Sequence, residues 1–409
     1  MAYVHISSSE IQKTKNVFFV GLLSFFGGIG QDIFSPILPL YLTSVLGLDK
    51  AFVGFADGVV TACSYLFKVI AGFLSDRFKK QKPIVFAGYL LSGIARPLLA
   101  LVSGAWAIVG LRAMDGMGKG IKDPPKDVLI AGSAQKQTRG RSFGIARMLD
   151  TMGSVAGPLL LFVLLALFKD SQFAYHWILL LSAVPLVITL CVLAFFVKEN
   201  NAPSLPVSEK RDADVTQLPR VFFVFLGIIM VFTLGNSSDA FLILRARQVG
   251  VTLIEIPLVI ALFNFAYAVA AVPFGALSDK IGRIPTMLIG WSAYALVYAG
   301  FAFASHAYWI WFLYALYGIY YATSEGIAKA LIADMVPVVS RGRAFGLYGA
   351  VIGLATLPAS IFMGFLWDRF GAQPAFLFGA GMACVAAVVL LVFSWKFKRD
   401  TLDTSLYVS

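Results

Sequence analysis

Twelve apolar segments of about 20 residues or more follow one another along the chain, and each is long enough to cross a bilayer as a helix. The composition agrees: 59% of the residues are hydrophobic and 13% are charged, whereas a typical soluble domain has about 25% charged residues. We therefore expect an all-α integral membrane protein with twelve transmembrane helices. The predicted segments are 17–45, 52–75, 83–102, 105–131, 143–168, 176–197, 220–244, 256–277, 286–304, 308–334, 343–366 and 373–395.

Lysine and arginine are distributed unevenly between the connecting segments, and this bias predicts the orientation. With the N-terminus in the cytoplasm, the cytoplasmic segments hold twenty of these residues and the opposite side holds five. The net charge of +11 is therefore a topology signal, and no nucleic-acid partner is expected. We expect both termini to be cytoplasmic and the protein to lie in the lipid bilayer of a bacterial inner membrane. The first segment is too long for a cleavable signal peptide, so it is expected to be a retained helix.

A polar stretch with three prolines separates the first six segments from the last six. Its composition is that of a linker. We expect an N-terminal six-helix bundle over 1–198, a cytoplasmic linker over 199–219 and a C-terminal six-helix bundle over 220–409.

Two motifs occur once in each half of the chain. Gly72-Phe-Leu-Ser-Asp76-Arg77 matches Gly275-Ala-Leu-Ser-Asp279-Lys280 at an offset of 203 residues. Arg139-Gly-Arg-Ser-Phe-Gly144 matches Arg341-Gly-Arg-Ala-Phe-Gly346 at an offset of 202 residues. Two independent matches at nearly the same offset indicate a duplicated unit of six helices.

The G-x-L-x-D-R motif resembles the most specific signature of the major facilitator superfamily, and the likeness covers essentially the whole chain. The resemblance implies two bundles related by a pseudo-twofold axis around a central cavity, and transport by alternating access. It also implies a monomer. An embedded enzyme is a further alternative, but no HExxH, GxSxG or paired catalytic motif supports it, so neither an enzyme nor a cofactor is expected. In that family the glycine lets two helices approach closely, and the loop contact breaks and re-forms during transport. A conformational gating role is therefore implied for Gly72, Asp76, Arg77, Gly275 and Asp279. The alternative is a plain cytoplasmic turn.

Two further patterns resemble motifs of the same superfamily. Arg112-Ala-Met-Asp115-Gly-Met-Gly118 is similar to a pattern whose arginine faces the cavity and is associated with proton coupling. Gly153-Ser-Val-Ala-Gly157-Pro158 resembles the glycine-rich signature of antiporters, but Leu161 stands where its last glycine belongs. Close helix packing with a proline kink explains the second pattern equally well.

Charged residues inside the predicted spans need a partner, a wet cavity or a function. Spacing on a helix face predicts four ion pairs: Arg112–Asp115, Asp115–Lys119, Arg147–Asp150 and Glu325–Lys329. The repeat relates Asp32 to Asp239 and Asp123 to Glu325, all on spans that line the cavity in the resembled family. The alternative to a transport role is a set of fixed ion pairs between helices. The cations are Lys68, Arg96, Arg112, Lys119, Lys122, Lys126, Arg147 and Lys329, and the acids are Asp32, Asp115, Asp123, Asp127, Asp150, Asp239 and Glu325.

From these charges we derive two sets of candidate site residues. Pro124 and Pro125 are expected to interrupt the fourth span, which makes the segment 119–127 either a gate or anion site or an ordinary helix end. Tyr317 and Tyr321 share a helix face with Glu325 and are candidates for contact with an organic solute. The candidates for proton coupling are Asp32, Asp239, Glu325, Arg112 and Asp115, and those for substrate binding are Lys119, Lys122, Arg147, Tyr317, Tyr321 and Lys329.

These observations predict a proton-coupled secondary transporter of a small organic solute, with efflux or antiport of a drug-like compound or metabolite favoured. Uptake or export of an organic anion, such as a polycarboxylate or siderophore, is an alternative. A non-transporting membrane sensor is a further alternative from another class. The three cysteines and three histidines show no spacing that indicates a disulfide or a metal site, so no metal is expected.

Overall fold

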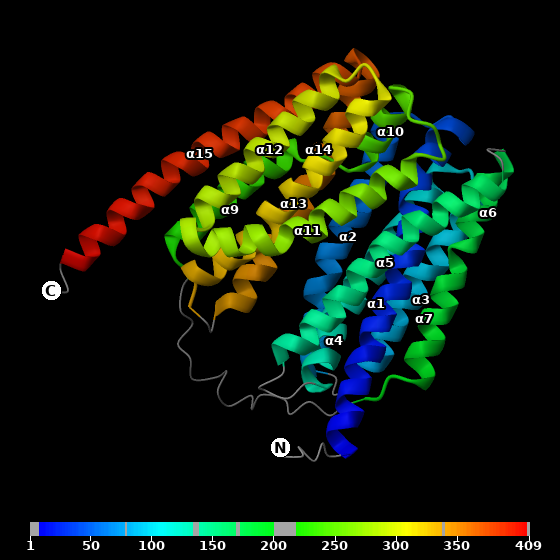
Figure 1. Cartoon of the computed structure of the whole chain (residues 1–409), viewed down its shortest axis with the longest axis horizontal. Coiled ribbons are helices and arrows are strands. Elements are labelled where there is room, and N and C mark those ends of the chain that lie inside the picture. The colour runs from blue at the N-terminus through cyan, green and yellow to red at the C-terminus, as the bar shows by residue number, and fades with distance from the viewer. Residues whose placement is uncertain are drawn as a thin grey trace, which may run out of the picture. The chain divides into compact units, whose positions relative to one another are not determined.

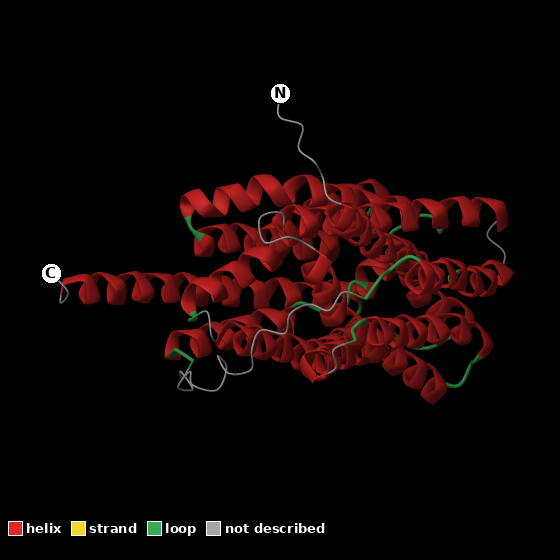
Figure 2. Ribbon diagram, turned by 90° about the horizontal axis from the view of Figure 1, so that it is seen from below, coloured by secondary structure: helices red, strands yellow, loops and turns green. Residues whose placement is uncertain are grey.

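The computed structural model describes residues 8–77, 80–133, 139–168, 172–199, 218–337 and 340–406. The side chains of Asp76, Arg77 and Glu325 and most of the linker 199–219 lie outside this description. Every regular element in the described ranges is a helix, as Figure 2 shows. The chain packs as two compact units.

The first unit comprises Met1–Leu46 and Val59–Asp212. Its first helix ends in a π-helical turn, η1 (Tyr41–Val45), and its third in a 3-10 turn, η2 (Leu99–Leu101). The helices are α1 (Ser8–Leu40), most of α2 (Lys50–Arg77), α3 (Lys82–Leu98), α4 (Ala105–Ser133), α5 (Arg139–Phe168), α6 (Gln172–Leu181) and α7 (Ala183–Phe195) (Figure 1).

The second unit comprises Gly47–Gly58, which includes the start of α2, and Ala213–Ser409. Its remaining helices are α9 (Arg220–Gly235), α10 (Ala240–Gln248), α11 (Ile256–Ile281), α12 (Arg283–Phe303), α13 (Ala307–Met335), α14 (Arg341–Phe370) and α15 (Ala372–Leu406).

The two units repeat the same pattern of helix packing. In the first unit α1 packs on α5 and α7, and α3 packs on α4 and α7. In the second unit α9 packs on α14 and α15, and α12 packs on α13 and α15. Each contact in the first unit has its counterpart in the second, with α9, α12, α13, α14 and α15 in the places of α1, α3, α4, α5 and α7. The duplicated motifs therefore belong to a duplicated bundle.

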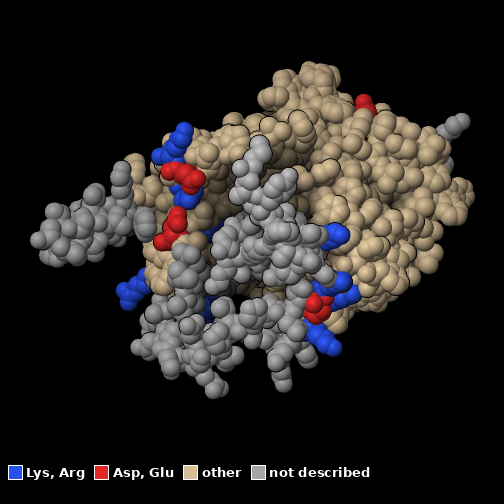
Figure 3. Space-filling view, turned by 60° about the horizontal axis from the view of Figure 1, so that its bottom comes forward, with Lys and Arg blue, Asp and Glu red and all other residues tan. Residues whose placement is uncertain are grey.

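Ten helical segments are long and apolar enough to cross a membrane. The two predicted spans that fall short are α4, which carries many charges, and α13, which is rich in tyrosine. Each has 29 residues, which gives a length of about 43 Å, so together with the ten they make twelve long helical segments in the described chain. Most of the described surface visible in Figure 3 is uncharged, as expected of a chain in contact with lipid.

Three predicted spans differ in detail from the helices observed. The span predicted over 176–197 is divided at Ser182, and that over 220–244 is divided between Gly235 and Ala240. In contrast, Pro124 and Pro125 lie inside an unbroken α4, so the predicted interruption there is wrong. The prolines remove two N–H donors, but membrane bundles tolerate this because neighbouring groups satisfy the carbonyls that are released.

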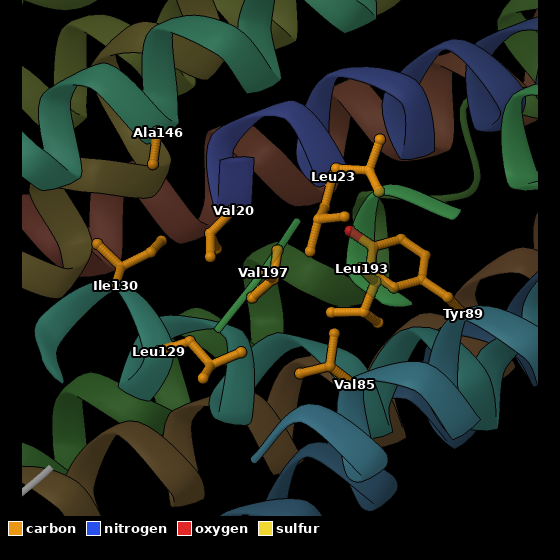
Figure 4. Close-up of a cluster of buried hydrophobic side chains, with 10 residues drawn as sticks. Val20, Leu23, Val85, Tyr89, Leu129, Ile130, Ala146, Leu193 and Val197 are labelled. Atoms are coloured by element: carbon orange, nitrogen blue, oxygen red, sulfur yellow. The ribbon is translucent and has the colours of Figure 1, made fainter. Parts of the chain in front are cut away.

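The core of the first unit lies where α1, α3, α4 and α7 meet. Val20, Leu23, Val85 and Leu193 are inaccessible to solvent, and Tyr89 is nearly so (Figure 4). Each fully buried aliphatic side chain contributes about 1.5–3 kcal/mol relative to an exposed one in water. This apolar cluster fixes the helices that carry the charged residues described below.

Glycines allow α1 and α5 to approach closely. A Cβ atom at Gly153 would lie 2.3 Å from the carbonyl oxygen of Phe25, and one at Gly157 would lie 2.8 Å from Cβ of Asp32. The glycine-rich pattern in α5 therefore serves helix packing. No described atom comes within 4 Å of a Cβ built at Gly72 or Gly275, so the close helix approach expected at these two glycines is absent from the described structure.

Candidate functional site

A polar cavity of about 160 Å³ lies inside the first unit, with walls formed by α1, α3, α4, α5 and α7. Such a polar cavity within a membrane bundle is a place where charged side chains are retained for function. Its charged lining residues are Asp32, Arg96, Lys122, Lys126 and Asp150.

Asp115 is the centre of a buried charge network next to this cavity. Its carboxylate is inaccessible to solvent and lies 3.0 Å from Nε of Arg96, 3.4 Å from Nη1 of Arg112 and 3.2 Å from Nζ of Lys119. The hydroxyl of Ser92 donates a further hydrogen bond of 2.8 Å. The two predicted pairs of Asp115 are both present, and Arg96 joins them from α3. Because three cations surround one carboxylate, this part of the unit carries an excess of positive charge.

A second network lies further along α4. Asp123 accepts from Nζ of Lys122 at 2.9 Å and lies 3.2 Å from Nζ of Lys68 on α2. The ammonium group of Lys122 also lies 5.1 Å from the ring centroid of Tyr89, which is within the range of a cation–π contact. Lys126 donates to the hydroxyl of Ser24 at 3.0 Å. Thus α4 is the main source of cations for the cavity wall.

Asp32 differs from Asp115, Asp123 and Asp150 because it forms no ion pair within the described chain. It lies on α1 in the cavity wall, and its carboxylate is hydrogen-bonded by Ser154 of α5. The charged groups that act on it are Arg96 of α3, Lys119 of α4 and Asp150 of α5. The same two cations contact Asp115, so Asp32 can gain or lose a proton without breaking an ion pair of its own.

In the second unit the polar residues gather at the break between α9 and α10. Asn236 donates to the hydroxyl of Tyr320 at 3.0 Å, and the hydroxyl of Tyr294 donates to the carbonyl of Gly235 at 2.9 Å. Ser238 donates through its hydroxyl to the carboxylate of Asp57 on α2. The backbone groups and side chains of the break are therefore satisfied by neighbouring helices, as a membrane interior requires.

Asp239 is the last residue of this break and the predicted counterpart of Asp32. Its carboxylate does not cap α10; instead it accepts hydrogen bonds from the hydroxyls of Tyr317 at 2.6 Å and Tyr321 at 3.1 Å. Its side chain is exposed, whereas Tyr317 is buried. The structure thus brings Asp239, a candidate for proton coupling, together with Tyr317 and Tyr321, the candidates for solute contact.

The remaining candidates are placed away from these two groups or lie outside the described side chains. Arg147 is exposed and paired with Asp150 at 3.4 Å, as its spacing predicted. Lys329 is exposed on α13, and its predicted partner Glu325 is not described. Asp279 is 2.5 Å from Nη1 of Arg283, which also contacts Asp334 of α13 at 3.3 Å. Asp76 and Arg77 end α2, but their side chains are not described.

Sequence reasoning did not select four residues that the structure places at these sites. Arg96 and Lys126 were recognised as charges within spans, but no helical spacing connects Arg96 with Asp115, 19 residues away. Asp57 and Ser238 are 181 residues apart, and nothing local predicts their contact. The run Asn236-Ser-Ser-Asp239 is rich in turn-forming residues, and this signal indicates the helix break.

Comparison with known proteins agrees with this architecture. The family model described as Major Facilitator Superfamily matches residues 20–244 and 223–404. The uncharacterized MFS-type transporter MJ1317 of Methanocaldococcus jannaschii is 36% identical over 393 residues, which cover 94% of this chain and 96% of that protein. The multidrug resistance protein MdtG of Proteus mirabilis is 25% identical over 401 residues, covering 93% and 95% of the two chains.

Solved structures show the same fold at low identity. A mutant of the nucleoside transporter NupG superposes with a TM-score of 0.78 at 14% identity, covering 94% of this chain and all of that one. A bacterial homologue of the human lysosomal transporter Spinster, in an inward-facing and unoccupied conformation, has a TM-score of 0.75 at 15% identity, covering 96% and 98%. With its repeated bundles, polar helix interiors and family match along nearly its whole length, the chain belongs to the major facilitator superfamily and is an integral membrane transporter.

Proposed function

We propose that this transporter couples the movement of a small organic solute to a proton that binds at Asp32, and that it works as an exporter. The observation that carries the proposal is the position of Asp32, in the wall of a polar cavity and without an ion pair in the described chain. Arg96 and Lys119 can exert their charge on either Asp32 or Asp115. A small helix movement would therefore change the affinity of Asp32 for a proton.

Export is favoured by the family relationships. The relative MdtG is named a multidrug resistance protein, and two shorter matches to proteins named MdtH are 27% identical. The biased distribution of lysine and arginine supports cytoplasmic termini in a bacterial inner membrane. Such a protein acts as a single chain on its solute and needs no cofactor.

A second candidate is transport of an organic anion, favoured by the cations of the same cavity. Arg96, Lys122 and Lys126 line it together. A carboxylate or phosphate group is the natural ligand of such cations. Arg96 and Lys122 are each already paired with an acid, which makes this candidate weaker.

The proposal is tested in proteoliposomes that contain the pH-sensitive dye pyranine. A panel of organic cations and anions is added outside, and the internal pH is followed for each compound. Proton antiport makes the lumen more alkaline as solute enters, whereas symport makes it more acidic. We expect alkalinisation with at least one compound, and its loss in Asp32→Asn.

Glu255→Gln is the matched control, since Glu255 is a partly exposed acid before α11 whose carboxylate accepts from Thr252 in the described chain. It should transport like the wild type. Solute-dependent pH changes that persist unaltered in Asp32→Asn would refute the assignment of the proton to Asp32. Binding of compounds without any flux would refute transport and support a sensor.

A further inference from the structure

Asp239 lies within the membrane span Arg220–Gln248, yet its side chain is exposed and has no ion pair in the described chain. A charge at such a position is retained where it meets water, a counter-charge or a ligand. The described residues that act on it are the donors Tyr317 and Tyr321 and a second acid, Asp57. None of these described residues is a cation, so within the described chain no positive group acts on the carboxylate of Asp239.

The surroundings of Asp239 are aromatic. Phe263 of α11 lies 5.5 Å from the ring of Tyr317 and 5.2 Å from that of Tyr321. Tyr267 lies 6.0 Å from the ring of Tyr321. Phe263, Tyr267 and Tyr321 are all partly accessible to solvent. A carboxylate beside accessible aromatic rings is the chemistry that recognises an organic ammonium group.

The helix break makes this arrangement possible. In a continuous helix Asp239 would lie on the regular surface of the span, but here the chain unwinds over 236–239 and the carboxylate turns to the tyrosines of α13. Broken helices of this kind commonly form solute sites in transporters. The two tyrosine hydroxyls use two of the roughly four acceptor positions of the carboxylate and leave the others for a ligand.

We propose that the second unit binds the positively charged group of an organic cation at Asp239, with the rings of Phe263, Tyr267 and Tyr321 against its apolar part. This inference rests on the proposed transport function and names its substrate class. It favours a lipophilic cation over the organic anion suggested by the cavity of the first unit. Asp57 acts electrostatically on Asp239 and adds to the negative potential of the site.

The test is binding of tetraphenylphosphonium to the purified full-length protein in lipid nanodiscs, measured by equilibrium dialysis without any pH gradient. Tetraphenylborate has nearly the same size and shape and the opposite charge, so it controls for non-specific partitioning, and empty nanodiscs supply the background. We expect saturable binding of the phosphonium ion and none of the borate. Asp239→Asn should weaken binding at least tenfold, or by about 1.4 kcal/mol.

Two further variants separate the ring contacts from folding defects. Phe263→Leu keeps an apolar side chain and should weaken binding about three- to tenfold through the lost cation–π contact. Glu255→Gln removes an acid of the same unit far from the site in the chain and should bind like the wild type. Wild-type binding by Asp239→Asn, or saturable binding of the borate instead, would overturn the inference. Either result leaves proton coupling at Asp32 standing, because that is measured separately by flux.

Discussion

Replacement of Asp115 by asparagine is expected to destabilise the first unit severely. The substitution keeps the shape of the side chain and its contact with Ser92, but removes the negative charge that three cations share at 3.0–3.4 Å. The carboxylate is completely buried, and Arg96 and Arg112 are nearly so. Removing one partner of a buried ion pair costs about 3–5 kcal/mol, and here more than one cation loses its partner.

For a unit of about 200 residues, this loss corresponds to a fall of roughly 10 °C in the unfolding temperature. The measurement is thermal unfolding of the purified protein by intrinsic fluorescence in one detergent. Asp368→Asn is the control, because its ion pair with Lys50 is partly exposed at 3.2 Å and is worth about 0–1 kcal/mol. Combining Asp115→Asn with Lys119→Gln should recover part of the loss, since one unbalanced cation is removed. A shift of about 2 °C is what the loss of an exposed ion pair would cause in a unit of this size. An unfolding temperature for Asp115→Asn within about 2 °C of that for Asp368→Asn would therefore refute this account of the network.

Two smaller effects follow from the packing of Gly153 and from the partly exposed carboxylate of Glu255. Gly153→Ala should lower the free energy of unfolding by about 1–3 kcal/mol, because its methyl group would overlap the carbonyl oxygen of Phe25. Gly275→Ala should be neutral or slightly stabilising, since no described atom lies near the added methyl group. Thermal unfolding of both variants in parallel checks this, and equal falls in unfolding temperature would contradict it. The backbone N–H and hydroxyl of Thr252 donate to Glu255 and hold the pKa of Glu255 below its usual value of 4.5. Any stability that Glu255 adds is therefore present above pH 4.5 and lost as the pH falls further, so the unfolding temperatures of wild type and Glu255→Gln should converge in acid and differ most near neutral pH.

The arrangement of helices could be predicted from the sequence because it depends on local composition and on repetition. The lengths of the apolar segments predict the membrane spans, and the motifs repeated in the two halves of the chain predict the two bundles. The ion pairs of Asp115 with Arg112 and Lys119, and that of Arg147 with Asp150, follow from helical spacing alone. All of these are short-range relations that a single helix specifies.

Contacts between helices could not be predicted in the same way. Tyr317 and Asp239 are 78 residues apart, and their contact depends on the break that turns the carboxylate toward α13. The predicted span 220–244 placed Asp239 within one helix, and the turn-forming residues 236–239 mark the break without showing which helix the carboxylate would face. Likewise, Asp32 forms no ion pair with Arg96 or Lys119 because of how α1, α3 and α4 are positioned along one another. Spacing within one helix does not predict that relative position.

The twelve residues Gly47–Gly58 belong to the second unit although they come early in the chain. Gly54, Gly58 and Gly364 fit closely there: added Cβ atoms would lie 2.2 Å from the Ser360 oxygen, 2.8 Å from Leu357 and 2.4 Å from Ala51. A split protein cut in the linker would therefore give a C-terminal fragment that lacks part of its own interior. Such a fragment could reach its native packing only by binding that helical segment of the co-expressed N-terminal fragment.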